Sequence, residues 1–128
     1  MSLKSPLRRV TYLGSAKGGS SHWYAQRVSA VALVLLGLWL AVSFATMDGA
    51  SHEHVVAWLS SPVAAAFAVL LVLVAAWHAM LGLLVVVEDY VGDKGRRFAV
   101  LLVVKFVFAV AAVIGVLAVL RIAFGVAG

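Results

Sequence analysis

Three long apolar runs, separated by two short polar segments, dominate the hydrophobic pattern of this chain. The runs cover about residues 28–46, 62–87 and 98–124. Each is long enough to supply the roughly 20 predominantly apolar residues that a helix needs to cross the hydrocarbon core of a bilayer. The second run is longer than this, which implies that its helix is tilted. The pattern therefore predicts an all-α membrane protein with three transmembrane helices.

The composition agrees with a bilayer as the solvent. Of the 128 residues, 65% are hydrophobic and only 12% are charged, which is more apolar surface than a soluble fold of this size can bury. The absence of cysteine excludes disulfides, iron–sulfur ligation and thiolate catalysis by this chain alone. The net charge of +5 lies beside the apolar runs. It therefore indicates membrane topology and contact with anionic lipid rather than nucleic-acid binding.

The distribution of lysine and arginine predicts the orientation of the chain. These residues are concentrated in segments 1–21 and 88–97 and are absent from segment 47–61. By the positive-inside rule, the N-terminus is cytoplasmic, and the first loop and the C-terminus are periplasmic. We interpret residues 1–21 as a cytoplasmic arm, irregular over its glycine- and serine-rich part 14–21, and residues 22–128 as a membrane anchor domain.

His78 is the strongest chemical signal, because it lies well inside the second apolar run. A neutral imidazole in hydrocarbon has a donor and an acceptor that both need partners, so an intramembrane histidine suggests a functional site. At about 100° per residue, Gly82 and Asp89 share its helix face, and Gly82 leaves room for a flat, bulky partner. Two interpretations stay open: a hydrogen bond between helices, or axial ligation of a haem iron. A bis-histidine haem would need its second ligand from another polypeptide.

Four further polar residues lie near the cytoplasmic ends of the apolar runs. Asp89 and Tyr90 fit a helix end in the aromatic belt, or a quinone site in which the phenol donates to a quinone carbonyl and the acid assists protonation. Arg27 and His22 fit interfacial residues that set topology, or partners of haem propionates and of a quinone carbonyl.

Small residues are frequent in all three runs, which predicts close packing with another subunit. No serine, histidine and aspartate converge at one depth, so the sequence indicates no hydrolytic site. No inverted repeat or broken helix is visible, which disfavours a transporter.

Two motifs resemble those of a known family. The first is SHWYAQRVSA, residues 21–30, at the start of the first run. The second is His78 with Gly82 four residues later and Asp89-Tyr90 at the end of the run. With the basic arm and three spans, they resemble the smaller hydrophobic anchor subunit, the D subunit, of proteobacterial succinate dehydrogenase (respiratory complex II).

The resemblance implies a multi-pass protein of the bacterial inner membrane that packs with a second three-helix anchor, the cytochrome b556 or C subunit. Together the two would hold the iron–sulfur subunit and the flavoprotein subunit at the membrane, and the dehydrogenase chemistry would belong to the flavoprotein. It implies one haem b shared between the two anchors. His78 matches the axial ligand, Gly82 lies in the pocket, Arg27 lies near the propionates, and His22 is close by.

The resemblance also implies a ubiquinone-reduction site on the cytoplasmic side, with Tyr90 as the matching phenol, Asp89 beside it and Arg27 near the pocket. Electrons from succinate oxidation would reach the quinone pool there. Two alternatives remain at this point. The chain could anchor a quinol:fumarate reductase, which runs the reaction backward, or it could be a structural membrane subunit without haem.

Overall fold

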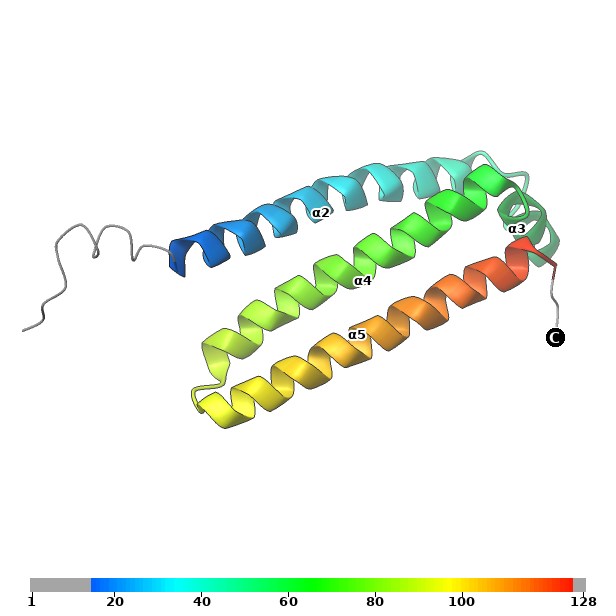
Figure 1. Ribbon diagram of the computed structural model, residues 1–128. Coiled ribbons are helices and arrows are strands. Elements are labelled where there is room, and N and C mark those ends of the chain that lie inside the picture. The colour runs from blue at the N-terminus through cyan, green and yellow to red at the C-terminus, as the bar shows by residue number, and fades with distance from the viewer. Residues whose placement is uncertain (1–14, 126–128) are drawn as a thin grey trace, which may run out of the picture.

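The computed structural model describes residues 15–125 of the chain. Within this range the elements are α2 (Ser15–Ala45), α3 (His52–Leu59), α4 (Pro62–Tyr90) and α5 (Lys94–Ala123), with no strand. The long helices α2, α4 and α5 lie side by side, and the short helix α3 joins α2 to α4 at one end (Figure 1). All three long helices are long and apolar enough to cross a membrane. The predicted all-α fold with three transmembrane helices is confirmed.

The start of α2 differs from the sequence prediction. The helix begins at Ser15, so the expected irregular segment 14–21 is wrong from residue 15 onward, and Gly14 lies outside the described residues. Glycine inside a helix costs only about 1 kcal/mol relative to alanine, whereas proline costs about 3 kcal/mol. No proline occurs between Ser15 and Pro62, so the helix of the apolar run extends toward the N-terminus.

Helix α3 lies in segment 47–61, which the sequence analysis treated as a loop. Ser51 caps this helix, because its hydroxyl accepts a hydrogen bond from the backbone N–H of His54 at 3.3 Å. On its inner side, Leu59 is buried and the Trp58 ring stacks on Trp39 of α2 with 5.3 Å between ring centroids. Phe67 of α4 meets the same Trp39 ring at 5.1 Å. An aromatic cluster therefore holds α2, α3 and α4 together at this end.

Helices α4 and α5 form an antiparallel pair joined by a short turn. Pro62 stands in the first turn of α4, where its missing N–H needs no partner. Helix α4 continues to Tyr90, so Asp89 and Tyr90 belong to its last turn rather than to a loop. The Asp93 carboxylate caps α5 by accepting from the backbone N–H of Arg96 at 2.8 Å.

The α4–α5 pair makes a close approach at a glycine. A Cβ added at Gly115 would lie 2.7 Å from Cγ1 of Val72 in α4, so only glycine fits without a shift of the neighbouring side chain. Close backbone approach at small residues is how helices associate in lipid. Apolar side chains elsewhere on α5 remain exposed, and none of its described residues is buried. Most of α5 therefore faces lipid or another protein.

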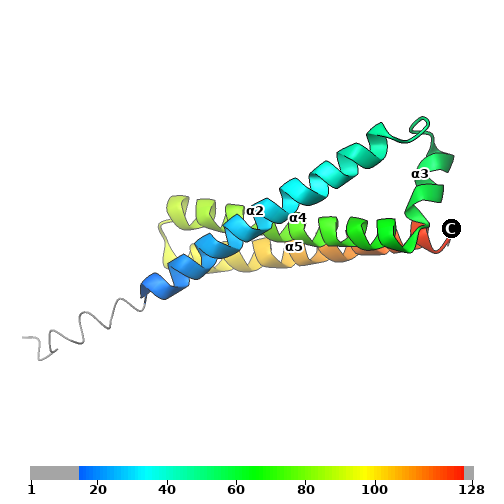
Figure 2. The ribbon, with the colours of Figure 1, turned by 90° about the horizontal axis from the view of Figure 1, so that it is seen from above.

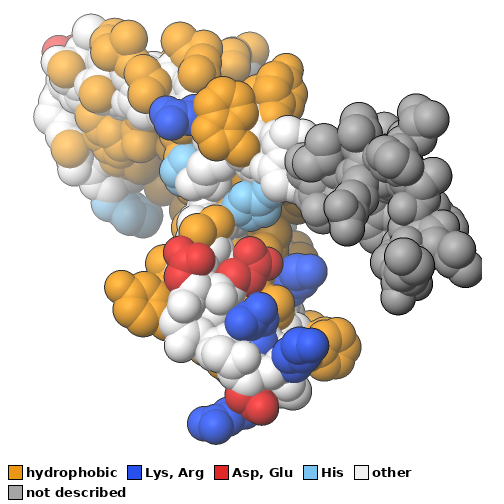
Figure 3. All heavy atoms as spheres, turned by 90° about the vertical axis from the view of Figure 1, so that its left-hand side faces the viewer, with side chains coloured by type: hydrophobic (Ala, Val, Ile, Leu, Met, Phe, Trp, Pro, Cys, Tyr) orange, Lys and Arg blue, Asp and Glu red, His pale blue; other side chains and the backbone are white. Residues whose placement is uncertain are grey.

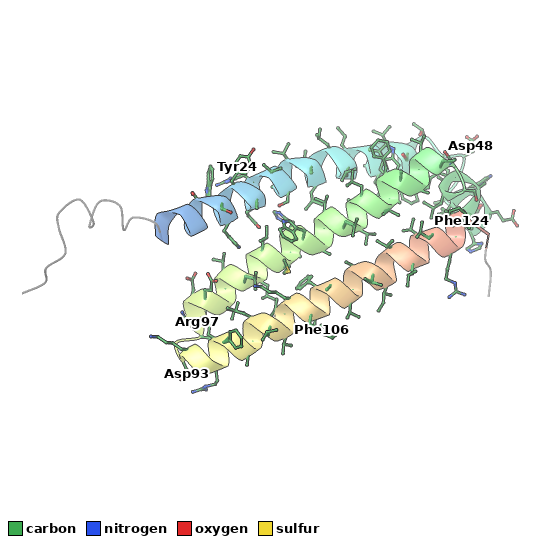
Figure 4. The ribbon with its side chains drawn as sticks, in the orientation of Figure 1. Tyr24, Asp48, Asp93, Arg97, Phe106 and Phe124 are labelled. Atoms are coloured by element: carbon green, nitrogen blue, oxygen red, sulfur yellow. The ribbon has the colours of Figure 1, made fainter. Side chains whose placement is uncertain are left out.

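Helix α2 crosses α4 at an angle instead of running parallel to it (Figure 2). We call the end with the α4–α5 turn the turn end and the opposite end the α3 end. Tyr24, Asp93 and Arg97 lie toward the turn end, and Asp48 and Phe124 lie at the α3 end (Figure 4). Seen from the turn end, acidic and basic side chains gather over the ends of α4 and α5 (Figure 3).

Candidate functional site

The His78 side chain lies between α4 and α2, where α2 crosses. Its Nδ1 is 2.9 Å from the hydroxyl oxygen of Ser29, and its Nε2 is 3.4 Å from the amide nitrogen of Gln26. Ser29 Oγ in turn donates to the backbone carbonyl of Gln26 at 3.0 Å. Gln26 and Ser29 are three residues apart on α2, so they share one face of that helix. Both nitrogens of the intramembrane histidine therefore meet polar groups of a neighbouring helix.

One hydrogen-bonding scheme satisfies all three of these contacts. An amide nitrogen can only donate, so Gln26 Nε2 donates to the lone pair of His78 Nε2. The neutral imidazole then carries its proton on Nδ1 and donates it to Ser29 Oγ. The single hydroxyl proton of Ser29 is given to the Gln26 carbonyl. The arrangement thus selects the tautomer of His78 in which Nε2 is free of a proton.

Gly82 lies beside the Gln26 amide that contacts His78 Nε2. A Cβ added at Gly82 would lie 3.7 Å from Gln26 Nε2, which is ordinary van der Waals contact. The side-chain oxygen of Gln26, Oε1, is buried and has no hydrogen-bond partner within the described part of the chain. A buried amide oxygen without a donor costs free energy, so this position calls for a polar group from outside the chain.

Arg27 and His22 lie on α2 toward the turn end. The Arg27 guanidinium lies 5.4 Å from the centroid of the Trp23 ring, in the range of a cation–π contact. Arg27 is exposed and His22 is half-buried. Among the side chains described, those of residues 19–125, the one ion pair joins Arg96 and Asp93 at 3.8 Å, so Arg27 is not paired with Asp89. The structure therefore keeps Arg27 and His22 apart from the His78 contacts.

Tyr90 and Asp89 end helix α4 at the surface of the turn end. Tyr90 is 85% exposed, and Asp89 is exposed as well. Tyr90 lines an open groove of about 390 Å³ together with Asp93, Arg96 and apolar residues of α5. The groove joins a phenol, a carboxylate and a guanidinium, and its remaining lining residues carry no polar side chain.

The sequence analysis assigned no role to Ser29, Gln26 or Arg96. Gln26 and Ser29 were visible only as part of the first motif. Their three-residue spacing at the start of an apolar run was the available signal, since polar side chains inside a span point to protein rather than lipid. Arg96 was counted as a topology-setting charge.

A multi-ligand metal centre is not found in the described range. Among residues 15–125, no group of three or more histidine, cysteine, aspartate or glutamate side chains could hold a metal ion.

The fold and this geometry define a class of protein: a three-helix membrane subunit with one polar contact deep between two helices. The family model of the succinate dehydrogenase/fumarate reductase transmembrane subunit matches residues 1–116. The chain belongs to this family. Among similar proteins are the succinate dehydrogenase hydrophobic membrane anchor subunits of Rickettsia bellii and Paracoccus denitrificans. The first is 37% identical over 76% of this chain and 85% of the relative, and the second 33% identical over 84% of each.

The resemblance read from the two motifs is thereby confirmed: the chain is a hydrophobic membrane anchor subunit of the proteobacterial succinate dehydrogenase kind. A third relative, from Rickettsia conorii, has the same description and is 32% identical over 80% of this chain. Together with the three apolar helices, this makes the chain a multi-pass membrane protein.

Proposed function

We propose that this chain anchors a succinate:quinone oxidoreductase to the bacterial inner membrane, supplies one axial ligand of a haem b, and forms part of a ubiquinone site. In this proposal a second anchor subunit supplies the other haem ligand, and the flavoprotein and iron–sulfur subunits dock at the turn end. The N-terminus and the turn end face the cytoplasm, because lysine and arginine gather there. The observation that carries the haem proposal is the pair of contacts that His78 makes, Nδ1 with the Ser29 hydroxyl and Nε2 with the Gln26 amide, which favours a lone pair on Nε2.

The residues around His78 fit a haem. An axial histidine needs a neutral imidazole with one free lone pair and a hydrogen bond from its other nitrogen, and His78 has this state. Gly82 adds no side chain beside the lone pair. The Gln26 amide contacts the lone pair at the long distance of 3.4 Å, and its rotatable side chain can turn aside. Haem b, when bound, supplies a one-electron iron couple.

In this role the residues of the chain would orient the His78 ring and shield the site from water. His78 holds its ring in one tautomer, and the apolar helices around it keep water away. Arg27 lies beside Trp23 on the same helix and pairs with no carboxylate of residues 19–125, so it is suited to pair with one such as a haem propionate. His22 lies on the same side of the membrane, half-buried, within reach of the same polar layer.

The haem proposal is tested by replacing His78. The chain is co-expressed with the other subunits of its complex, and reduced-minus-oxidised optical spectra of membranes are compared for wild type and His78→Ala. We expect a b-type α-band in wild type that is lost in the variant. His54→Ala is the matched control, because His54 only bonds Ser51 and the Gly49 carbonyl in the exposed α3 end. A full b-type band in His78→Ala would contradict the proposal.

The quinone proposal rests on the groove at the turn end. Tyr90 offers a phenol proton for a quinone carbonyl, and Arg96 lines the same groove as a cation. Asp89, the exposed residue before Tyr90 in the last turn of α4, provides an acid. As the quinone is reduced, its carbonyl oxygen gains negative charge and its hydrogen bond strengthens. Hydrogen bonds to charged groups contribute about 1.5–3 kcal/mol.

Tyr90→Phe removes that donor while keeping the ring. We expect succinate-driven quinone reduction to fall about ten- to a hundredfold, because about 1.4 kcal/mol corresponds to a factor of ten. Electron transfer from succinate to an artificial acceptor at the soluble subunits should not change. Tyr24→Phe, another exposed phenol toward the same end, is the control. Wild-type quinone turnover in Tyr90→Phe would remove Tyr90 from the site.

A further inference from the structure

We infer that Ser29 is a positioning residue for His78: its hydroxyl fixes the tautomer and the ring orientation of the histidine and thereby tunes the haem that His78 holds. The inference rests on the proposed haem ligation. It concerns a residue on a different helix from the ligand, so the site would be built by the crossing of α2 and α4 rather than by α4 alone.

The burial of Ser29 is the first observation. Among the residues whose side chains the structure describes, Ser29 is the one buried polar residue, with 6% of its surface exposed. A polar group buried within a membrane helix is costly unless it is paired, so its partner indicates its use. That partner is His78, 49 residues away in the chain.

Other hydroxyls of the chain show what an ordinary intramembrane serine does. Ser43 donates to the carbonyl of Trp39 one turn earlier at 2.8 Å, which satisfies the hydroxyl within its own helix. Ser29 also donates within its helix, to the Gln26 carbonyl, but its oxygen then accepts from His78. This second contact is short, at 2.9 Å, and it joins two helices. Ser43 is therefore a matched control for Ser29.

The contact has a predictable effect on the ligand. A hydrogen bond donated by the far nitrogen of an imidazole raises the basicity of the ligating nitrogen and fixes the ring plane. A more basic imidazole favours ferric over ferrous iron. Losing the acceptor at Ser29 should therefore raise the midpoint potential of the haem. It should also weaken haem retention, by about 10–100-fold where similar partners of metal ligands have been removed.

The test is an equilibrium redox titration of the b-type haem in the purified complex, followed by its optical spectrum. Ser29→Ala should shift the midpoint to a more positive value or lower the ratio of haem to flavin. Ser29→Thr, which keeps the hydroxyl, and Ser43→Ala should both match wild type. A tenfold change in the relative affinity for ferric and ferrous iron would correspond to a shift of about 59 mV for one electron.

The outcomes separate this inference from the haem proposal. If His78→Ala keeps its b-type band, the haem ligation itself is wrong. If His78→Ala loses the band but Ser29→Ala has the wild-type midpoint and haem content, only the role of Ser29 is wrong. If Ser29→Ala prevents assembly, Ser29→Cys is titrated instead, because a thiol of similar size is a weak acceptor. A wild-type midpoint and haem content in Ser29→Cys would then overturn the inference.

Discussion

Helix α4 packs against two long helices, α5 and α2, and it meets them in different ways. Its contact with α5 depends on shape: at Gly115 the helices lie so close that an added Cβ would reach within 2.7 Å of Val72. Its contact with α2 depends on chemistry, because His78, Ser29 and Gln26 form a hydrogen-bonded group where the helices cross. The difference is visible in the arrangement, since α5 runs beside α4 in both ribbon views whereas α2 crosses it (Figures 1 and 2).

This contrast suggests a division of labour between the two contacts. In lipid there is no hydrophobic force between helices, so close packing at small residues provides much of the association. Hydrogen bonds between membrane helices average only about 0.6 kcal/mol in double-mutant cycles, so the polar group adds little stability. Because these polar residues contribute so little to stability, binding of a ligand explains their presence better than association of the helices does. We therefore expect the α4–α5 contact to be sensitive to an increase in side-chain size. The α2–α4 contact should be sensitive to changes at the hydrogen-bonding residues where the helices cross.

Gly115→Leu should disrupt the close α4–α5 contact and cause the largest loss of stability. The side chain has no space at Val72, and overpacking costs about 1–3 kcal/mol. The measurement is the midpoint of thermal unfolding of the full chain in detergent micelles. Gly37→Leu is the control, because a Cβ at Gly37 meets nothing within 4 Å. Equal destabilisation by the two substitutions would show that the α4–α5 approach is not tight.

Gly82→Leu should perturb the α2–α4 contact with a smaller effect. We expect the free energy of unfolding to fall by about 1 kcal/mol, at the low end of overpacking costs. Its branched side chain would push into the Gln26 amide next to His78, and the b-type band of the complex should broaden or weaken. Gly82→Ala should behave like wild type, because its Cβ lies at an ordinary 3.7 Å from Gln26 Nε2. A normal spectrum with Gly82→Leu would mean that this space is not needed.

The smallest effect is expected from a double-mutant cycle between Ser29→Ala and His78→Ala, measured on the haem-free chain in detergent. The coupling free energy should be about 0.6 kcal/mol, the average for hydrogen bonds between membrane helices. The parallel cycle with Ser43→Ala should give a value near zero, since Ser43 bonds only within α2. Equal coupling in both cycles would argue against the contact between Ser29 and His78.

Much of the fold could be predicted from the sequence because it follows from local patterns. Apolar runs of sufficient length must form helices in a bilayer, where each backbone N–H and C=O needs a partner. The runs at 28–46, 62–87 and 98–124 therefore correspond to α2, α4 and α5, although these helices extend beyond several of the predicted ends. Helix α3 was not predicted because its apolar pattern is too short to distinguish a helix from a loop. The packing of Trp58 on Trp39, which supports this helix, is a tertiary contact.

The candidate site was predicted only in part. His78 stood out because a titratable side chain inside a span is rare, and Tyr90 stood out through its place at the end of the run. The partners of His78 did not stand out, because Ser29 is 49 residues away and its hydroxyl resembles that of any serine in a membrane helix. The groove beside Tyr90 depends on Arg96 of the next helix, and nothing in the spacing indicated that the two residues would line one surface.

The sequence by itself determined the class of solvent, the number of spans, the family and the one histidine in the membrane interior. Each of these depends on composition, on local periodicity or on short motifs. Only the tertiary structure decided which nitrogen of His78 carries the proton, because that depends on a hydroxyl and an amide brought there by the crossing of α2 over α4. It also decided that Gly115, rather than another of the described glycines, lies at the tight contact. Crossing angles arise from side-chain packing over whole helices, so no single position in the sequence records them.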